Sequence, residues 1–376
     1  MSDGITICSV GDLMICDSPL YASVGVGSKY KNKTTELFKY CVNEFKAADI
    51  VIGNFETVVH EPKDKSIKET QMCCSRKTLS DLKDVGFSIL SLANNHCMQH
   101  GVEGFKNTVE TCEKDNIHPI GVMDESPYLV DINGMKLAFI ALCIHLEWYE
   151  PDHILYENSI ERILNIVQKL RADDKDVVII LSVHWGDEFA THPSNAQIKL
   201  AHRLVDNGAD IVLGHHPHVY QGIEEYNGAV VVYSQGNFIS DMVPVICRQT
   251  GIIKLKIYGR KKIKFTWEPY IIREDLIPVS DESDWLKDRQ NELENALIGK
   301  YTDNDYWKMI AKNHSAGHNA FKSYFKKNIK KYKLSISSKM IFDFLGRKVK
   351  RITGTSTDGR VSSMDMSIYE CLDKFK

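Results

Sequence analysis

The chain has 376 residues, of which 43% are hydrophobic and 26% charged, and its formal net charge is −3. This is the composition of a globular protein with one large or two ordinary domains, and the slightly negative charge argues against a nucleic-acid-binding protein. The ten cysteines form no CxxC pair, which excludes a cysteine-rich zinc scaffold and indicates reduced thiols. The N-terminus lacks a signal-peptide pattern, and no run approaches the roughly 20 apolar residues that span a bilayer. Together these features predict a cytoplasmic protein without a transmembrane segment.

In chain order, short apolar runs typical of strands alternate with amphipathic runs typical of helices. In the first half the predicted strands are 5–10, 49–56 and 87–96, and the predicted helices are 34–48, 79–86 and 101–116. The pair Asn133-Gly134 between two apolar runs predicts a hairpin within 128–142.

The alternation continues to about residue 240. The predicted helices of this half are 159–173 and 193–208, and the predicted strands are 176–186, 209–216 and 228–237. Residues 251–270 alternate with a period of two around Gly259-Arg260, which predicts a second hairpin. Apolar strands that alternate with helices predict an α/β fold whose largely parallel sheet is covered by helices on both faces.

After about residue 275 the chain becomes rich in lysine and mostly helical or irregular. We therefore predict two regions, a first domain at 1–272 and a C-terminal, mostly helical region at 273–376. Within the second region, 321–350 combines many lysines with aromatic residues near one helical face. Such a segment either makes a weak peripheral contact with an anionic membrane or polymer, or packs its aromatic face on the first domain.

Six apolar runs end in residues of the types that bind metals. Because the carboxyl ends of parallel strands meet at one edge of a sheet, these side chains are expected to converge. They are Asp12, Asn54, Glu56, Asn94, Asn95, His96, His184, Asp187, Glu188, His215, His216, His218, Gln235 and Asn237.

The converging groups are carboxylates, amide oxygens and imidazoles, with no thiolate. That ligand set suits Mn²⁺, Fe²⁺, Zn²⁺ or Mg²⁺. A carboxylate able to bridge, Glu56, together with several imidazoles predicts two divalent metal ions about 3.5–4 Å apart, an arrangement that activates water for attack at phosphorus.

The motifs "GDLM", "NFE", "SLANNH", "HWGDE", "GHHPHVYQGIE" and "YSQGNF" follow one another between about residues 4 and 245. In this order they resemble the bacterial CapA family of poly-γ-glutamate capsule biosynthesis, which looks like a branch of the calcineurin-like metallophosphoesterases. The resemblance implies a calcineurin-like sandwich, a divalent metal centre and an anionic polymer or phosphoester substrate.

The resemblance also assigns roles to single residues. It implies that Asp12, Glu56, Asn95, His184, His216 and His218 are metal ligands, with Glu56 in the bridging position. It implies that His96 polarises the leaving oxygen. His215 is interpreted as a residue that supports the ligands or lies at the surface. The spacing of His216 and His218 matches the family's His-x-His pair, and a strand would place both on one face.

One position departs from the phosphoesterase pattern. Those enzymes have Asp-x-His in the first motif, whereas this chain has Met14 two residues after Asp12. The first metal therefore lacks an imidazole, and a water molecule, Asn54 or Asp17 is expected to take its place. The CapA proteins resemble this chain in lacking that histidine.

Several further residues are candidates for contact with the substrate. Glu188 is a candidate general acid or a solvated side chain at a strand exit, and Trp185 either lines the pocket or packs in the core. Arg76, Lys77 and Arg248 are candidate anion-binding residues. Predicted substrate contacts are Asn54, Trp185, Asn237 and Arg76.

The first functional hypothesis is a CapA-like, metal-dependent hydrolase or transferase of the phosphoesterase type that acts in making a capsular polymer. The alternative is a module on the same fold that binds an anionic polymer or a partner without catalysis, which Met14 and the basic C-terminal segment favour. A nucleotide phosphatase is a third possibility.

Overall fold

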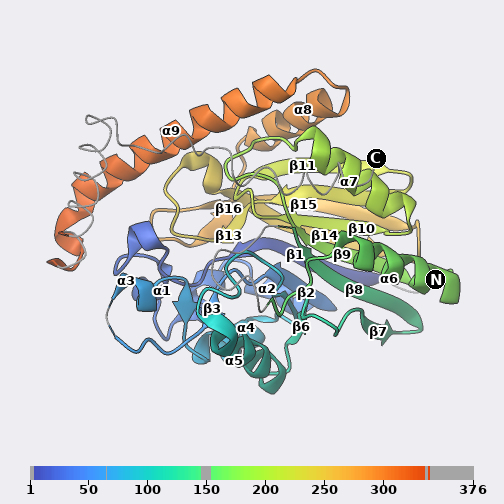
Figure 1. The fold of residues 1–376 in the computed structure, drawn as a ribbon, viewed down its shortest axis with the longest axis horizontal. Helices are drawn as coiled ribbons and strands as arrows, with labels where there is room; N and C mark the ends of the chain where they lie inside the picture. The colour runs from blue at the N-terminus through green and yellow to red at the C-terminus, as the bar shows by residue number, and fades with distance from the viewer. Residues whose placement is uncertain (1–3, 65, 145–153, 335–337, 339–376) are drawn as a thin grey trace.

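Two β-sheets lie face to face, and helices cover their outer surfaces (Figure 1). The computed structural model describes residues 4–64, 66–144, 154–334 and 338. Strands of the first sheet contact strands of the second, as β1 does with β10 and β12. The molecule therefore has a core between the sheets and further cores beneath the helices.

The first sheet has a parallel centre and an antiparallel margin. Strands β1, β2, β5 and β6 run parallel to one another, β13 pairs with the end of β1, and β14, β15 and β16 are antiparallel. In spatial order the strands are β16 (Pro278–Ser280), β15 (Ile263–Ile272), β14 (Gln249–Ile257), β1 (Ile5–Leu13), β2 (Ile50–Asn54), β5 (Ile89–Ser91) and β6 (His118–Ile120), with β13 (Asn237–Ile239) beside β1.

The second sheet repeats this plan. Strands β12, β10, β9 and β8 are parallel, whereas β11 and β7 at the two edges are antiparallel. In spatial order they are β11 (Tyr220–Tyr226), β12 (Ala229–Gln235), β10 (Ile211–His215), β9 (Val178–His184), β8 (Met135–Cys143) and β7 (Tyr128–Ile132). A separate two-stranded ladder joins β3 (Val58–Val59) to β4 (Cys73–Cys74).

Helices cover the outer face of each sheet. Residues of α4 (Lys77–Val85) and α5 (Gly101–Lys114) pack with the first sheet, and α6 (Ile160–Asp173) and α7 (Asn195–Asp206) pack on the second. The predicted helix at 34–48 is divided, because a 3₁₀ turn at Thr34–Phe38 precedes α2 (Val42–Ala47). The shorter helices are α1 (Val26–Lys29) and α3 (Ile67–Thr70).

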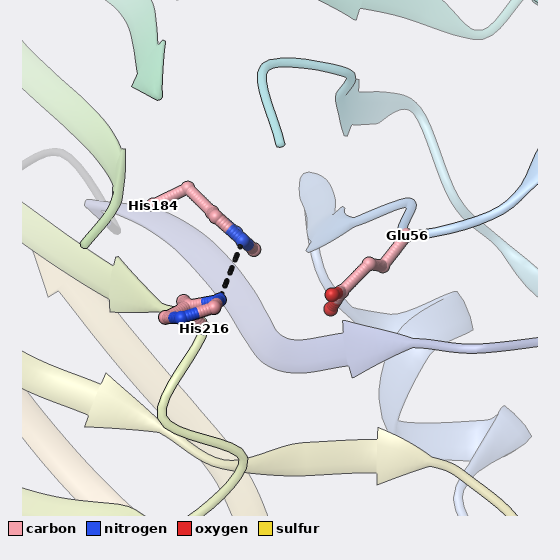
Figure 2. A group of neighbouring side chains, drawn as sticks. All are labelled: Glu56, His184 and His216. Atoms are coloured by element: carbon pink, nitrogen blue, oxygen red, sulfur yellow. Dashed lines mark hydrogen bonds between the residues drawn. The ribbon is translucent and has the colours of Figure 1, made fainter. Parts of the chain in front are cut away.

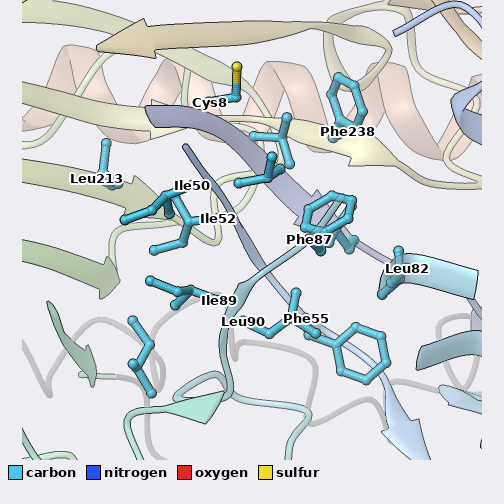
Figure 3. Close-up of a cluster of buried hydrophobic side chains, with 14 of the residues drawn as sticks. Cys8, Ile50, Ile52, Phe55, Leu82, Phe87, Ile89, Leu90, Leu213 and Phe238 are labelled. Atoms are coloured by element: carbon cyan, nitrogen blue, oxygen red, sulfur yellow. The ribbon is translucent and has the colours of Figure 1, made fainter. Parts of the chain in front are cut away.

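The central strands of the second sheet, β9, β10 and β12, are buried on both faces. In β9, Ile180 belongs to the cluster between the sheets, whereas Ile179 and Leu181 belong to the cluster beneath α6 and α7. This follows from the period of two in a strand. Figure 3 shows the cluster that contains Leu213 of β10 together with Ile50 and Ile52 of β2. Even-numbered side chains of β9 therefore point toward the first sheet.

These features confirm the predicted α/β sandwich, with parallel order in the central strands and antiparallel margins. Both predicted hairpins are present, β7–β8 and β14–β15. The first sheet extends past the predicted boundary at 272, since β16 pairs with β15. Beyond it, α8 (Trp285–Leu297) and α9 (Asp303–Asn328) form the helical region. Within the described ranges, no helix combines the length and the apolar character needed to cross a membrane.

The last part of α9 packs through aromatic side chains. The ring of Tyr21 meets those of Phe321 and Tyr324 edge-on at 5.5 and 5.4 Å, and Phe325 meets Tyr332 at 5.0 Å. These contacts agree with the alternative in which the segment 321–350 packs its aromatic face on the first domain. Residues 335–337 and 339–350 of that segment lie outside the described residues.

Two carboxylates hold the loop that follows β1. Asp17 accepts hydrogen bonds from the backbone of Ser23 and Ser28 at 2.8 Å each, and Asp241 accepts from the backbone and the hydroxyl of Ser18 at 3.0 and 2.6 Å. Gly25 lies so close to both that a Cβ there would be 2.2 Å from Asp241 Oδ2. The loop is therefore fixed by buried polar contacts.

Asp241 gives this loop a pH-dependent stability. Burial raises the pKa of Asp241 to about 7. Since an unfolded aspartate ionises near pH 4, the native state resists ionisation between about pH 4 and 7, and this carboxyl makes stability fall as the pH rises through that window.

Asp241→Asn should remove this trend. The free energy of unfolding of the variant should therefore rise relative to that of the wild type by up to roughly 1 kcal/mol per pH unit within the window, and the difference should stay constant above it. Urea unfolding at pH 4.5, 6 and 7.5 measures this trend, with Asp84→Asn, at an exposed position of α4, as the control. A difference between variant and wild type that stays constant with pH would contradict the prediction.

Candidate metal centre

The ends of four strands bring the candidate ligands to one place. Asp12 lies near the end of β1, Glu56 follows β2, His184 ends β9, and His216 and His218 follow β10. His184 is even-numbered in β9 and so points toward the first sheet. Figure 2 shows Glu56 reaching from the side of the first sheet toward His184 and His216.

Two groups of ligand atoms share one carboxylate. Glu56, His184 and His216 have ligand atoms within 4.8 Å of one another, and so do Asp12, Glu56 and His218. All five residues are buried. The shared residue is Glu56, which the resemblance assigns to the bridging position, and each group supplies imidazole and carboxylate ligands of the kind that divalent metals take.

The Glu56 carboxylate is the strongest sign that cations belong here. Both of its oxygens are buried and accept no hydrogen bond from any described residue. The Nε2 atoms of His96 and His218 each lie 3.8 Å from Oε1, beyond hydrogen-bond distance. Burial raises the pKa of Glu56 well above its usual range, although the charge of His218 opposes the shift. A buried carboxylate without donors fits a metal-bridging ligand.

The second group has nitrogen and oxygen atoms of the kind that bind metals turned toward one another. Nε2 of His184 lies 3.1 Å from Nδ1 of His216 and 2.9 Å from Oδ1 of Asn95. Two imidazole nitrogens and an amide oxygen thus converge opposite Glu56, as Figure 2 shows for the two histidines. This set of atoms fits a divalent metal, and Asn95, which lies beside His184, stays a predicted ligand.

Asp12 organises the other group. Its Oδ1 accepts from Nδ2 of Asn54 at 2.8 Å and lies 3.2 Å from Nδ1 of His215, while its Oδ2 lies 3.2 Å from Nδ1 of His218. Burial alone would raise the pKa of Asp12, but the hydrogen bonds and charges of His215 and His218 outweigh it and hold the pKa well below its usual range. Burial likewise opposes the charged form of His218, yet Glu56 and Asp12 raise the pKa of His218 to about 10.

The histidine pair is held by a turn and not by a strand. Strand β10 ends at His215, so the expectation that a strand aligns His216 and His218 is wrong, although both reach the metal groups. Their backbone φ angles are 96° and 57°, in the left-handed region that non-glycine residues rarely adopt. Such backbone conformations cost free energy and are held by their surroundings at functional sites.

His215 supports the ligands, the first of its two predicted alternatives. It is odd-numbered in β10, like Leu213, and so points between the sheets. Its side chain is buried, with Nδ1 against Asp12 and Nε2 3.4 Å from Nε2 of Gln235. It is not a surface residue.

Asn54 and Asn237 orient ligands and are too deeply buried to touch a substrate. Both are 0% exposed. Asn54 lies between Asp12 and His184, 3.3 Å from the Nδ1 atom of His184. Asn237 Oδ1 lies 2.9 Å from Nδ1 of His218. Their predicted contact with the substrate is therefore corrected to a role in positioning the ligands.

Trp185 packs in the core, so its predicted contact with the substrate is wrong. Its side chain is 0% exposed and belongs to the cluster beneath α6 and α7. Its indole N–H donates to the carbonyl of Tyr233 at 2.8 Å, and the two rings stack. The physical reason is strand alternation, because the residue after His184 faces the opposite side.

Arg76 also lies apart from the metal groups. Its guanidinium donates to Asn107 and Thr111 of α5 at 3.0 and 3.4 Å, so it joins α4 to α5. Lys77 pairs with Asp81 one turn along α4. The structure therefore gives neither residue a place beside the ligands.

Met14 lies in an apolar cluster with Cys16 and Met72, against which Met242 packs. Its sulfur accepts a hydrogen bond from the hydroxyl of Ser240 at 3.6 Å. Asp17 holds the loop after β1 and does not take the place of the expected imidazole. Asn54 is the remaining protein candidate, since its side chain reaches Asp12.

His96 and Glu188 stand at the edge of the two groups. Nδ1 of His96 lies 2.7 Å from Oε1 of Gln99, and burial lowers the pKa of His96. Glu188 is half-buried, and its negative charge acts on Glu56 and His96. Gln99 was not predicted as a site residue; its position three residues after His96 is the sequence signal that could have indicated it.

The fold and this constellation define an α/β protein with a candidate binuclear metal centre. The family model "Bacterial capsule synthesis protein PGA_cap" matches residues 6–242, more than half of the chain. The chain therefore belongs to this bacterial capsule-synthesis family. The matched range contains the strand ends that carry the candidate ligands.

Curated relatives agree with this membership. The "PGA biosynthesis protein CapA" of Bacillus subtilis strain 168 is 29% identical over 307 residues, which cover 76% of each chain. The "Capsule biosynthesis protein CapA" of Bacillus anthracis is 28% identical over 256 residues, covering 64% of this chain and 61% of that protein.

Among solved structures, the NAD nucleotidase of Haemophilus influenzae has a TM-score of 0.43 at 13% identity, covering 84% of this chain and 60% of that one. The 5'-nucleotidase of Candida albicans SC5314 has a TM-score of 0.43 at 11% identity, covering 88% and 59%.

Proposed function

We propose that this CapA-family chain is a metal-dependent hydrolase of the phosphoesterase type that acts in making or processing a capsular polymer. The observation that carries the proposal is the buried Glu56 carboxylate, shared by two groups of ligand atoms and lacking a hydrogen-bond donor among the described residues. A purely structural carboxylate would be expected to have donors.

The candidate ligands would hold two metal ions, and Glu56 belongs to both groups of ligand atoms. Asp12 and His218 would hold one ion, and His184, His216 and Asn95 the other. When bound, such a pair activates water and stabilises the charge that develops in an in-line displacement. Asn54 and Asn237 keep the ligand side chains in place.

His96 would assist departure of the leaving group. Its Nδ1 is engaged by Gln99, so Nε2, which lies 3.8 Å from Glu56, is the atom left to transfer a proton. Glu188, half-buried near the same side chains, is the second candidate acid. General acid catalysis of this kind contributes about 10²–10⁴-fold.

The polymer assignment comes from the family and its relatives. The Bacillus subtilis relative is a PGA biosynthesis protein, and a Mycobacterium tuberculosis relative, 24% identical over 222 residues, is a probable polyglutamine synthesis accessory protein. We therefore propose an anionic polymer such as poly-γ-glutamate, or a phosphoester intermediate of its synthesis, as the substrate.

A second candidate function is a binding module without catalysis. Met14 supports it, because the first group has one imidazole, His218, where the phosphoesterase pattern has a further one. The two candidates differ in metal content and turnover.

The test is a metal analysis of protein purified without chelator, together with hydrolysis assays. The substrates are poly-γ-glutamate, bis-(p-nitrophenyl) phosphate and a panel of nucleotides. Two bound metals and hydrolysis that is lost in His184→Ala would support the proposal. Metal-free, inactive protein that still binds poly-γ-glutamate would establish the binding module, and turnover restricted to nucleotides would establish a nucleotide phosphatase.

A further inference from the structure

A basic cavity, separate from the candidate metal centre, lies beside the loop after β1. It has a volume of about 530 Å³ and is formed by the loop at Ser23–Lys29, the segments after β13 and β15, and the end of α9. Cations dominate its charged lining, namely Lys29, Arg248, Arg273, Lys327 and Lys331, against the carboxylates Asp241 and Glu274.

Most of these cations have no carboxylate partner. Arg273 pairs with Asp275, but among the described residues no carboxylate forms an ion pair with Arg248, Lys327 or Lys331. Lys29 likewise forms no such ion pair, although the negative charge of Asp275 acts on it as well as the positive charge of Lys331. The carboxylates compensate this charge only in part, since Asp241 is bound to Ser18, whereas Glu274 and Asp275 act on Arg248 by charge without an ion pair.

Arg248 is the most deeply placed of the unpaired cations. Its side chain is half-buried, and within the described part of the chain the guanidinium donates through Nε, to the carbonyl of Ile272, and through no other nitrogen. Burial lowers the pKa of Arg248, since a charged group loses hydration there. A half-buried guanidinium with free N–H groups is suited to hold a carboxylate or phosphate by two hydrogen bonds.

We propose that this cavity binds a segment of a polycarboxylate chain. A volume of this size accommodates a ligand much larger than one inorganic anion, and the unpaired cations come from several segments, so they can hold successive negative groups. The choice of a glutamate oligomer as that chain rests on the proposed function, whereas the cavity and its charge do not.

The cavity stands next to the metal centre. Met242 lines it, and the sulfur of Met242 accepts from Nδ2 of Asn237 at 3.6 Å, while Oδ1 of Asn237 contacts His218. A polymer anchored here would therefore have its neighbouring units close to the predicted ligands. The cavity would act as an anchoring subsite that holds the chain while one bond lies at the metals.

The test compares two pairs of lysines, each with one member in the last turn of α9 and one in the 3₁₀ turn at Ile329–Lys331 that follows it. Lys327 and Lys331 line the cavity, whereas the equally exposed Lys326 and Lys330 do not. Lys327→Gln/Lys331→Gln should weaken binding of a γ-linked glutamate decamer about five- to tenfold, because each exposed charge contact contributes modestly. Lys326→Gln/Lys330→Gln removes the same charge and should change the affinity by less than about twofold. Arg248→Gln should add to the loss.

Calorimetric titration at fixed ionic strength measures these affinities on the full chain. An equal loss of affinity in the two double variants, or no binding of the decamer at all, would overturn the proposal. Tighter binding of tripolyphosphate with the same dependence on Lys327 and Lys331 would overturn the choice of a carboxylate ligand. A His184→Ala protein should bind the decamer as the wild type does. If the protein hydrolyses none of the substrates but decamer binding still depends on Lys327 and Lys331, the proposed enzyme is refuted and the assignment of the cavity stands.

Discussion

Glu56→Gln is expected to empty both metal sites. Glu56 belongs to both groups of ligand atoms, so one substitution removes the common ligand and the negative charge that offsets two cations. Losing a residue that only supports a ligand costs about 10–100-fold in metal affinity, and losing the shared ligand should exceed about 100-fold. The amide has nearly the shape of the carboxylate, so the fold should persist.

Metal content after gel filtration and activity on the best substrate are the two measurements. The expected result is less than one metal per chain and no turnover, with an unchanged circular dichroism spectrum. His184→Ala and His218→Ala each touch one group and should each lose about one metal. Glu225→Gln, on β11 away from the ligands, should keep both metals and full activity.

Retention of two metals by Glu56→Gln would show that the carboxylate does not bridge. A loss of both metals in His184→Ala and in His218→Ala as well would show that the two sites fill together, and Glu56 would then have no special position among the ligands.

Much of the fold and the ligand set could be predicted from the sequence because both follow from strand geometry. Apolar runs that alternate with amphipathic helices define the two sheets, and the ends of parallel strands meet at one edge. Glu56 and His184 were therefore predictable as neighbours although they are 128 positions apart in the sequence. The same rule could have corrected the prediction that Trp185 contacts the substrate, since a residue that follows an inward-facing histidine must face outward.

Other features depend on contacts that local patterns do not contain. Arg76 follows a strand, as the ligands do, but a partner 31 residues away, Asn107, draws it to α5. The left-handed turn at His216 and His218 resembles a strand continuation in sequence. The basic cavity brings together Arg248 and lysines at and just after the end of α9, where Phe321 and Tyr324 dock the helix on Tyr21.

His96→Gln is expected to lower kcat by about 10²–10⁴-fold while leaving metal content unchanged. His96 lies beside the ligands, but it belongs to neither group of ligand atoms, and its Nδ1 is engaged by Gln99. Substitution should therefore remove proton donation and spare the metals.

Gln99→Ala removes the side chain that orients the imidazole and should lower kcat by less, about 10–100-fold. The nearby His100, whose Nε2 lies 2.8 Å from the backbone carbonyl of Gln71, provides the matched control, and His100→Gln should keep near-normal kcat.

The leaving group separates a proton donor from a structural residue. A p-nitrophenolate departs without a proton, whereas an alkoxide requires one, so the effect of His96→Gln should be large for alkyl phosphoesters and small for p-nitrophenyl esters. Steady-state kinetics on both substrates, with metal content measured on the same samples, gives the comparison. A loss of equal size for the two leaving groups, or a loss that follows metal content, would assign His96 to holding the site together. A loss confined to the poor leaving group would identify it as the acid, because neither metal binding nor folding distinguishes one leaving oxygen from another.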